Sequence, residues 1–83
     1  MKPLKMIYLS EENGMITPLR FQLREADESY KTIKVQNIVM RTEEKLAGSR
    51  MLIFRCQSEI NGVLQVYELK FEPASSRWYL YKM

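Results

Sequence analysis

Apolar and polar residues alternate along most of the chain, and short polar segments containing glycine or proline separate the alternating runs. Such alternation is typical of β-strands that bury one face. Asn-Gly occurs twice between alternating runs, at 13–14 and at 61–62. Because both residue types tolerate a positive φ, Asn-Gly is a strong signal for a tight β-hairpin turn. The pattern therefore predicts two β-hairpins.

A two-residue loop at 61–62 predicts the register of the second hairpin. It places Cys56 opposite Tyr67 on a largely apolar face. On the other face it places Arg55 opposite Glu68, which is a favourable cross-strand pair of opposite charges. A slip by one residue would move every apolar side chain to the polar face, so this register is strongly specified.

The first Asn-Gly predicts a hairpin in which Met6 lies opposite Phe21 and Tyr8 lies opposite Leu19. Pro18 is next to this predicted pairing, and proline has no N–H to donate to a β-ladder. The proline therefore indicates an unpaired position or a bulge, and we expect the first hairpin to be irregular near its turn.

The third alternating run changes phase part-way along its length. Ile33 and Val35 share one face, whereas Ile38 and Met40 fall on the opposite face. A bulge or a sharp bend near residues 36–37 would account for this change. The pattern therefore predicts one long strand that serves two parts of a curved sheet.

A polar segment after this run carries local helix signals. Thr42 is placed as an N-cap, Glu43 and Glu44 fall in a first turn, and Gly48 is placed to end the helix. The segment is short, so the signals predict at most one helical turn, near residues 42–47.

The last run, residues 77–83, is apolar or aromatic on both faces. Trp78 and Leu80 share one face, and Tyr79 and Tyr81 share the other. The alternation alone leaves open which of the two faces the core.

These runs together predict one small all-β domain that covers residues 1–83. About six strands follow one another as an antiparallel meander, and such a sheet forms a small barrel or a strongly bent sheet. Whether the sheet closes is left open by the pattern.

The composition excludes several classes of chemistry. The chain has 83 residues, no histidine and one cysteine, so a zinc site of Cys and His ligands or an intrachain disulfide is not expected. The same shortage of bases and nucleophiles predicts a protein that is not an enzyme and needs no cofactor. The N-terminal residues lack the apolar segment of a signal peptide, and no apolar run is long enough for a membrane helix. We therefore expect a soluble, cytoplasmic protein that does not bind membranes.

The net charge of +3 permits binding to a polyanion but does not require it. Acidic residues outnumber basic ones in residues 1–30, so the positive excess falls in residues 31–83. In this later part, aromatic and basic residues are interleaved on the last strand, and the first candidate interaction surface consists of Arg77, Tyr79, Tyr81 and Lys82. These tyrosines either stack on nucleic-acid bases or grip a peptide, or they cover a second apolar layer.

The second candidate surface is a basic band on the outer face of the central hairpin. It would form if the preceding strand lies alongside, and it would consist of Lys34, Arg41, Arg55 and Lys70. Glutamates interrupt this face, at positions 59, 68 and 72. A face of cross-strand ion pairs is therefore the alternative interpretation, and exposed pairs of that kind contribute little to stability.

The chain also resembles certain small uncharacterised bacterial β domains that accompany Y-family DNA polymerase-like proteins. The resemblance covers about Pro18 to Leu80 and rests on scattered residues in a common order, namely Pro18-x-x-Phe21, Val35-x-x-Ile38, Phe54-Arg55-Cys56, Tyr67-Glu68-Leu69 and Arg77-Trp78-Tyr79-Leu80. It implies an accessory role near DNA repair or a mobile element, with no catalytic residue to transfer.

Two functions are compatible with this sequence. The first is a non-enzymatic adaptor or oligomerising interaction module, whose partner is another protein or a second copy of the chain, because terminal strands leave sheet edges open. The second is an accessory protein that binds single-stranded nucleic acid weakly and is linked to DNA repair.

Overall fold

The computed structural model describes residues 1–83 and contains seven β-strands and no helix. The strands are β1 (Lys2–Ser10), β2 (Ile16–Arg24), β3 (Tyr30–Lys34), β4 (Asn37–Leu46), β5 (Ser49–Ile60), β6 (Val63–Glu72) and β7 (Arg77–Lys82). There is accordingly no helix with the length and apolar character needed to cross a membrane.

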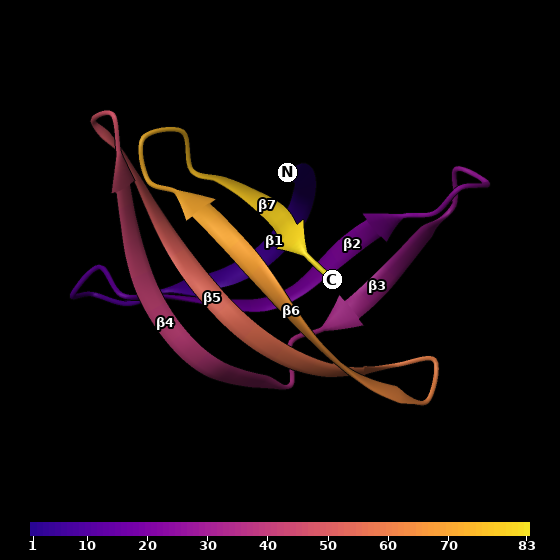
Figure 1. Ribbon diagram of the computed structural model, residues 1–83. Helices are drawn as coiled ribbons and strands as arrows, with labels where there is room; N and C mark the ends of the chain where they lie inside the picture. The colour runs from indigo at the N-terminus through magenta and orange to yellow at the C-terminus, as the bar shows by residue number, and fades with distance from the viewer.

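All seven strands belong to one antiparallel sheet with the order β3-β2-β1-β7-β6-β5-β4 (Figure 1). Strands β1 to β3 form one meander and strands β4 to β7 form another; we call these the first and second wings. The first and last strands of the chain join the wings, because Leu4 of β1 pairs with Trp78 of β7. The predicted all-β architecture is confirmed, with seven strands and with the consecutive order interrupted at the pairing of β1 with β7.

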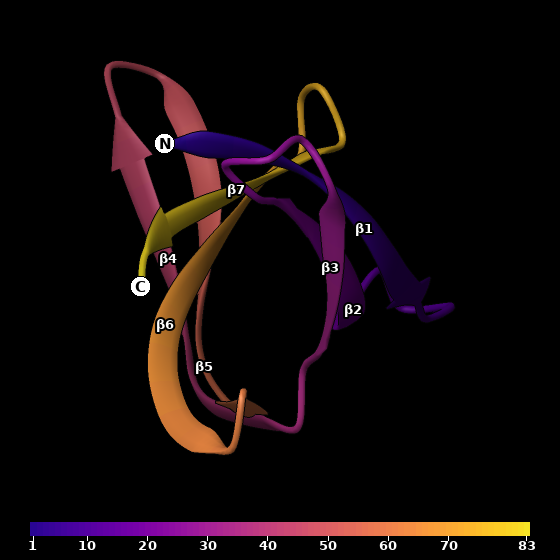
Figure 2. The ribbon, with the colours of Figure 1, turned by 90° about the vertical axis from the view of Figure 1, so that its right-hand side faces the viewer.

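The sheet is strongly bent, so the two wings fold towards each other and enclose a core on the concave side (Figure 2). Strands β3 and β4 are the two edges of the sheet, and they do not pair with each other. The sheet therefore forms a half-barrel that does not close.

The bend predicted near residues 36–37 is present, and it divides the predicted long strand into β3 and β4. At the division, Val35 N–H donates to Leu19 C=O of β2 at 2.9 Å, and the next residue, Gln36, donates its N–H to Gln57 C=O of β5 at 3.2 Å. The chain thus crosses from the first wing to the second within two residues. This crossing explains the change of phase in the sequence.

The helical turn predicted near residues 42–47 is wrong. The segment is part of β4, where Thr42 pairs with Ile53 and Glu43 pairs with Leu52. Gly48, expected to end a helix, is instead the second residue of a tight turn, with φ of +83° after Ala47 at +50°. A continuous ladder with the long strand β5 outweighs helix signals that amount to one turn, because short helices are marginal without packing.

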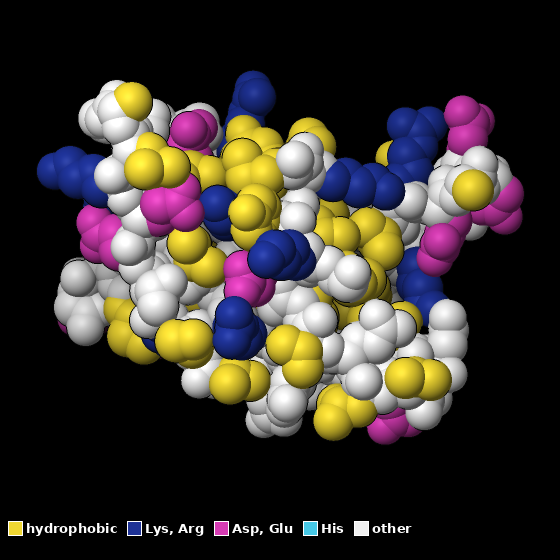
Figure 3. Space-filling view, in the orientation of Figure 1, with side chains coloured by type: hydrophobic (Ala, Val, Ile, Leu, Met, Phe, Trp, Pro, Cys, Tyr) yellow, Lys and Arg dark blue, Asp and Glu magenta, His cyan; other side chains and the backbone are white.

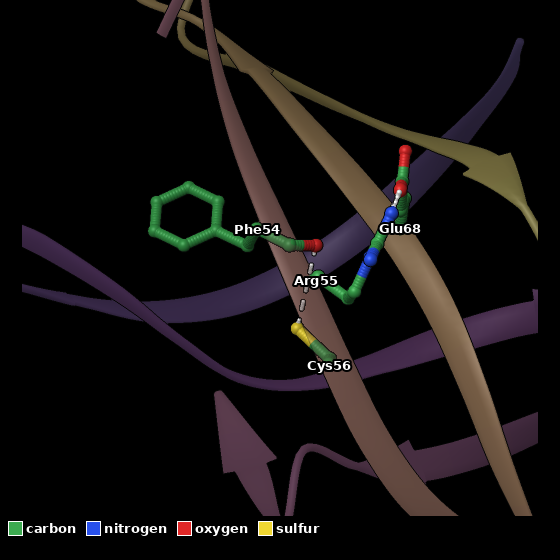
Figure 4. Close-up of polar contacts among 4 residues, drawn as sticks. All are labelled: Phe54, Arg55, Cys56 and Glu68. Carbon is green, nitrogen blue, oxygen red and sulfur yellow. Dashed lines mark hydrogen bonds and ion pairs between the residues drawn. The ribbon is translucent and has the colours of Figure 1, made fainter. Parts of the chain in front are cut away.

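The predicted register of the second hairpin is confirmed between β5 and β6. Cys56 pairs with Tyr67 and Arg55 pairs with Glu68. Figure 4 shows the side chains of Arg55 and Glu68 pointing towards each other, with Nη2 and Oε2 separated by 2.8 Å. The register holds because Asn61 and its following glycine have φ of +53° and +77°, which a two-residue turn requires.

The first hairpin departs from its predicted register. Met6 lies opposite Phe21 as predicted, but Tyr8 lies opposite Pro18 and not opposite Leu19. The loop spans Glu11 to Met15, because Glu11 N–H donates to Met15 C=O at 2.8 Å. A longer loop shifts the pairing by one residue, and the ladder absorbs the shift as a bulge next to the proline, as the sequence indicated.

The core lies on the concave side and contains residues of both wings. Its buried members are Ile16, Phe21, Ile33, Phe54, Cys56, Ile60, Tyr67, Leu69, Phe71 and Trp78. Leu80 packs against this cluster, so the face of β7 that carries Trp78 and Leu80 is the inner one. The alternative left open by the sequence is thereby resolved, and the two tyrosines of β7 face outward.

A buried hydrogen-bond chain ties the two wings together. Ser58 Oγ donates to Lys34 C=O at 2.6 Å, and it lies 2.5 Å from Tyr67 Oη. A serine hydroxyl has one proton to donate, so the Tyr67 hydroxyl is the donor in the second bond. These two hydrogen bonds connect β6 and β5 of the second wing to the end of β3 in the first wing.

Candidate functional site

The aromatic strip predicted on the last strand is exposed in part, but the ring of Tyr81 already contacts two lysines of the same chain. Tyr79 is half-buried, and Tyr81 is exposed. Lys70 Nζ lies 3.9 Å from the centre of the Tyr81 ring, and Lys82 Nζ lies 5.6 Å from it. Arg77 is exposed and pairs with Glu72 across the ladder. The ring of Tyr81 is therefore engaged within the fold.

The predicted basic band is not assembled on one surface. Arg55 forms an ion pair with Glu68 at 2.8 Å. Lys70 is buried on the outer face of the second wing, where its Nζ lies 3.1 Å from a carboxylate oxygen of Glu44. Lys34 lies on β3, in the other wing. In the space-filling view, charges of both signs are interspersed with apolar side chains over β4 to β6 (Figure 3).

Arg41, the remaining member of the predicted band, reaches from β4 towards the concave side. Its Nη1 donates to Ile16 C=O at 2.7 Å, its Nη2 donates to Thr17 Oγ1 at 3.3 Å, and its guanidinium lies 5.3 Å from the centre of the Phe54 ring. The side chain therefore links β4 to the beginning of β2. Its role in this structure is to hold the wings together.

A different set of cations gathers on the outer face of the first wing. Phe21 of β2 is opposite Ile33 of β3, and both are buried, so the residues before and after each point outward. Arg20 consequently lies directly opposite Lys34 on the outer face. In the next row, Lys5 of β1 is opposite Gln22, which is opposite Thr32. We define the basic face as Lys5, Arg20, Arg24 and Lys34.

Only one cationic side chain of the basic face forms an ion pair with an acidic side chain. Lys5, Arg20 and Lys34 form no ion pair, and Arg24 contacts Glu28 at 3.5 Å with both side chains exposed. The acidic residues of the first wing lie instead in its two connections, at positions 11, 12, 25, 27 and 28. Like charges directly opposite each other destabilise a sheet, so the Arg20–Lys34 pair costs stability unless an anion lies between them.

Two neighbouring hollows form a trough along this face. One has a volume of about 260 Å³ and the other of about 650 Å³, and Lys5 and Gln22 line both. Arg20 and Thr32 line the smaller hollow, and Tyr30 lines the larger one. Tyr30 is 61% exposed, so its ring is free to contact a ligand at that end of the trough.

A third hollow, of about 490 Å³, lies between the β1–β2 loop and the inner side of β4 and β5. Its cations are satisfied within the chain, because Arg50 Nε lies 2.8 Å from Glu43 Oε1 and Arg41 is bound as described above. The hydrogen bond from Arg50 and its positive charge lower the pKa of Glu43. The trough on the basic face is therefore the better candidate for an anionic ligand.

The sequence contains a signal for the basic face that a count of charges along the chain misses. Residues 1–30 have more acidic than basic residues, yet the acids fall in turns and the bases fall on strands. The alternation of Phe21 with Arg20 and Gln22 shows which side of β2 is polar. The missing information is the pairing of β2 with β3, which brings Lys34 to Arg20.

Cys56 is the one cysteine of the chain, and its surroundings keep the thiol protonated. The thiol is fully buried and lies 3.6 Å from Phe54 C=O (Figure 4). Burial raises its pKa from 9.0 to about 12, and the positive charge of Arg41 offsets only part of this increase. A thiol in this state is a poor nucleophile at neutral pH. No group of three or more metal-ligating side chains is present.

Stability is expected to decrease at alkaline pH because of two buried groups. Burial raises the pKa of Cys56 from 9.0 to about 12 and that of Tyr67 from 10.0 to about 12. In the unfolded chain both protons are released near the ordinary values, whereas the folded protein retains them. The stabilisation is therefore complete below pH 9 and is lost progressively up to pH 12. Urea unfolding between about pH 8 and about pH 11 measures this decrease. Cys56→Ala should flatten the profile, and a midpoint independent of pH in both proteins would contradict the expectation.

The cations of the first wing are exposed and aligned in rows on paired strands. No family model, curated protein or solved structure matches the chain.

Proposed function

We propose that this protein binds single-stranded nucleic acid through the basic face of its first wing. The observation that carries the proposal is the direct opposition of Arg20 and Lys34 on paired strands, with no acidic side chain to neutralise either. Phosphates placed along this row would convert a repulsive pair into an anion site. This surface lies on the first wing, and it shares only Lys34 with the two surfaces that the sequence indicated.

The spacing of the cations supports a polymeric ligand. Neighbouring strands lie about 4.8 Å apart, and successive outward residues of one strand lie about 6.7 Å apart. Lys5, Arg20, Arg24 and Lys34 therefore occupy positions of a regular grid and not one converging pocket. A grid of this kind suits the repeated phosphates of a chain better than a single small anion.

The shape of the face supports a single strand in preference to a duplex. Tyr30 is exposed beside the trough, where its ring can stack on an unpaired base. Gln22 and Thr32 lie in the middle row, where they can hydrogen-bond to base edges. A duplex keeps its bases paired and stacked, so it offers no free base to the Tyr30 ring.

Fluorescence anisotropy with a labelled single-stranded oligonucleotide of mixed sequence tests the proposal. The resemblance to domains that accompany Y-family polymerases makes DNA the first probe, with RNA and duplex DNA of equal length as further arms. We expect the logarithm of the affinity to decrease linearly with the logarithm of the salt concentration. Arg20→Gln with Lys34→Gln should reduce this slope by about 1.4, at about 0.7 for each lost contact.

The matched control is Arg77→Gln with Lys82→Gln. It changes the net charge by the same amount, lies on the surface that the sequence indicated, and leaves the basic face intact. We expect its slope to equal that of the unmodified protein. Equal effects of the two double variants, a larger effect of the control, or no binding at low salt would refute the proposal.

A further inference from the structure

The edge strand β4 exposes a long set of unpaired backbone groups, which is regular after the bulge between Ile38 and Met40. β4 has ten residues and pairs with β5 alone among the strands. Exposed edges of this length pair readily with another strand unless something covers them. The opposite edge, β3, is shorter, with five residues, and it also packs against β5.

The tight turn after β4 determines which residues face the open edge. A two-residue loop at 47–48 makes Leu46 and Ser49 a hydrogen-bonded pair. Hydrogen-bonded pairs recur at every second residue of an antiparallel ladder, so Thr42 directs its N–H and C=O towards β5. Arg41 and Glu43 therefore direct theirs away from the sheet, as does Lys45.

Charge limits how a second β4 strand can pair with this edge. Within residues 41–45, a two-fold antiparallel pairing can be centred on any of the five residues. Centring on Glu44 or on Lys45 places like charges opposite each other at the axis. Centring on Arg41 places two arginines opposite each other, and centring on Glu43 places two glutamates opposite each other. Centring on Thr42 instead places each Arg41 opposite Glu43 of the partner subunit, which is favourable in both copies.

We propose that two copies of this chain associate through antiparallel pairing of their β4 strands, with Thr42 at the two-fold axis. The two sheets then form one continuous sheet, and two Arg41–Glu43 pairs select the register. The occupant of the edge is a second copy because the charge pattern of β4 is complementary to itself. The inference is independent of the proposed nucleic-acid binding, which uses the other wing.

Complementary charge reversals test the pairing, with association measured by sedimentation equilibrium at concentrations up to about 1 mM. The unmodified protein should be in monomer–dimer equilibrium. Arg41→Glu alone should be monomeric, because it brings carboxylates together across the axis, and Glu43→Arg alone should be monomeric because it brings guanidinium groups together. An equimolar mixture of these two variants should form a heterodimer, since each opposing pair again joins opposite charges.

A second variant keeps the proposal falsifiable if a charge reversal weakens the fold through the intrachain contacts of Arg41 and Glu43. Glu43→Pro removes an N–H that faces the open edge and spares the ladder with β5, and proline is accepted in edge strands for that reason. Circular dichroism establishes that it is folded. We expect a folded monomer. A monomeric unmodified protein, a dimeric Glu43→Pro variant or a mixture without heterodimers would overturn the inference.

Discussion

Trp78→Ala is expected to remove a large part of the stability of this protein. The Trp78 side chain is 3% exposed, and its ring centre lies 4.9 Å from that of Phe71 and 5.3 Å from those of Tyr8 and Phe54. Truncation of such a residue costs about 3–5 kcal/mol. A domain of 83 residues has a free energy of unfolding of about 4–12 kcal/mol.

The position of Trp78 in the sheet increases its importance. It lies on β7, where it pairs with Leu4 of the first wing on one side and with Phe71 of the second wing on the other. The aromatic rings that surround it also come from both wings. Loss of the indole therefore weakens the junction of the wings as well as the core itself.

Urea unfolding followed by far-ultraviolet circular dichroism measures this effect, because the variant lacks the tryptophan fluorophore. Trp78→Phe is the matched control. The Trp78 Nε1 atom has no hydrogen-bond partner, so replacing tryptophan with phenylalanine reduces the ring volume but breaks no hydrogen bond. We expect less than half of the destabilisation caused by alanine. An alanine variant within about 1 kcal/mol of the unmodified protein would show that the ring is not central to the core.

Phe21→Ala is expected to produce the second large effect, again about 3–5 kcal/mol. Phe21 is 1% exposed on β2, and its ring packs edge-to-face against Tyr67 of β6 at 5.6 Å between centres. It is therefore a direct contact between the wing that carries the basic face and the opposite wing. We expect the first wing to open locally at a lower free energy than the rest of the sheet.

Hydrogen exchange resolves this opening by segment, and urea unfolding gives the total change. In Phe21→Ala, the amides of β2 and β3 should lose protection more strongly than those of β5 and β6. Leu19→Ala on the same strand is the control, because Leu19 is 41% exposed and should cost less than about 1 kcal/mol. Uniform loss of protection in all strands would argue against separate opening of the first wing.

The parts of the fold that the sequence predicts correctly are those in which pairing is local. The register of β5 and β6 follows from a two-residue turn, because a turn of known length leaves one alignment that buries the apolar face. The Arg55–Glu68 pair follows directly from that register. The first hairpin was less predictable, since its loop extends from Glu11 to Met15 and shifts the pairing beyond Ile7.

The segment from 42 to 47 shows how local signals are overruled. Thr42 and the following glutamates suit the first turn of a helix, and the same residues also form a regular ladder with β5. The ladder satisfies the backbone groups of β4 that face β5, whereas one isolated helical turn would satisfy almost none. A comparison of this kind requires knowledge of β5 as a neighbour.

The candidate site was predictable only in part. The alternation in β1 and β2 already places Lys5 and Arg20 on the polar side of the first hairpin. The sequence does not reveal that β3 adds Lys34 directly opposite Arg20. Nor does it reveal that Lys70, which alternation places outward, is buried with Glu44 as its partner.

The sequence by itself determined the strands outside residues 42–47, the turn at 61–62 and the apolar face of the hairpin strands, because these depend on backbone preferences and on a period of two residues. It left open which face of β7 is the inner one. The tertiary structure decided the pairing of β1 with β7, the bend that makes the half-barrel and the neighbours of each charge. These features depend on contacts between residues far apart in the chain. The free energy that stabilises these contacts comes from burying both wings against one core. A local sequence pattern does not show which distant residues will meet there.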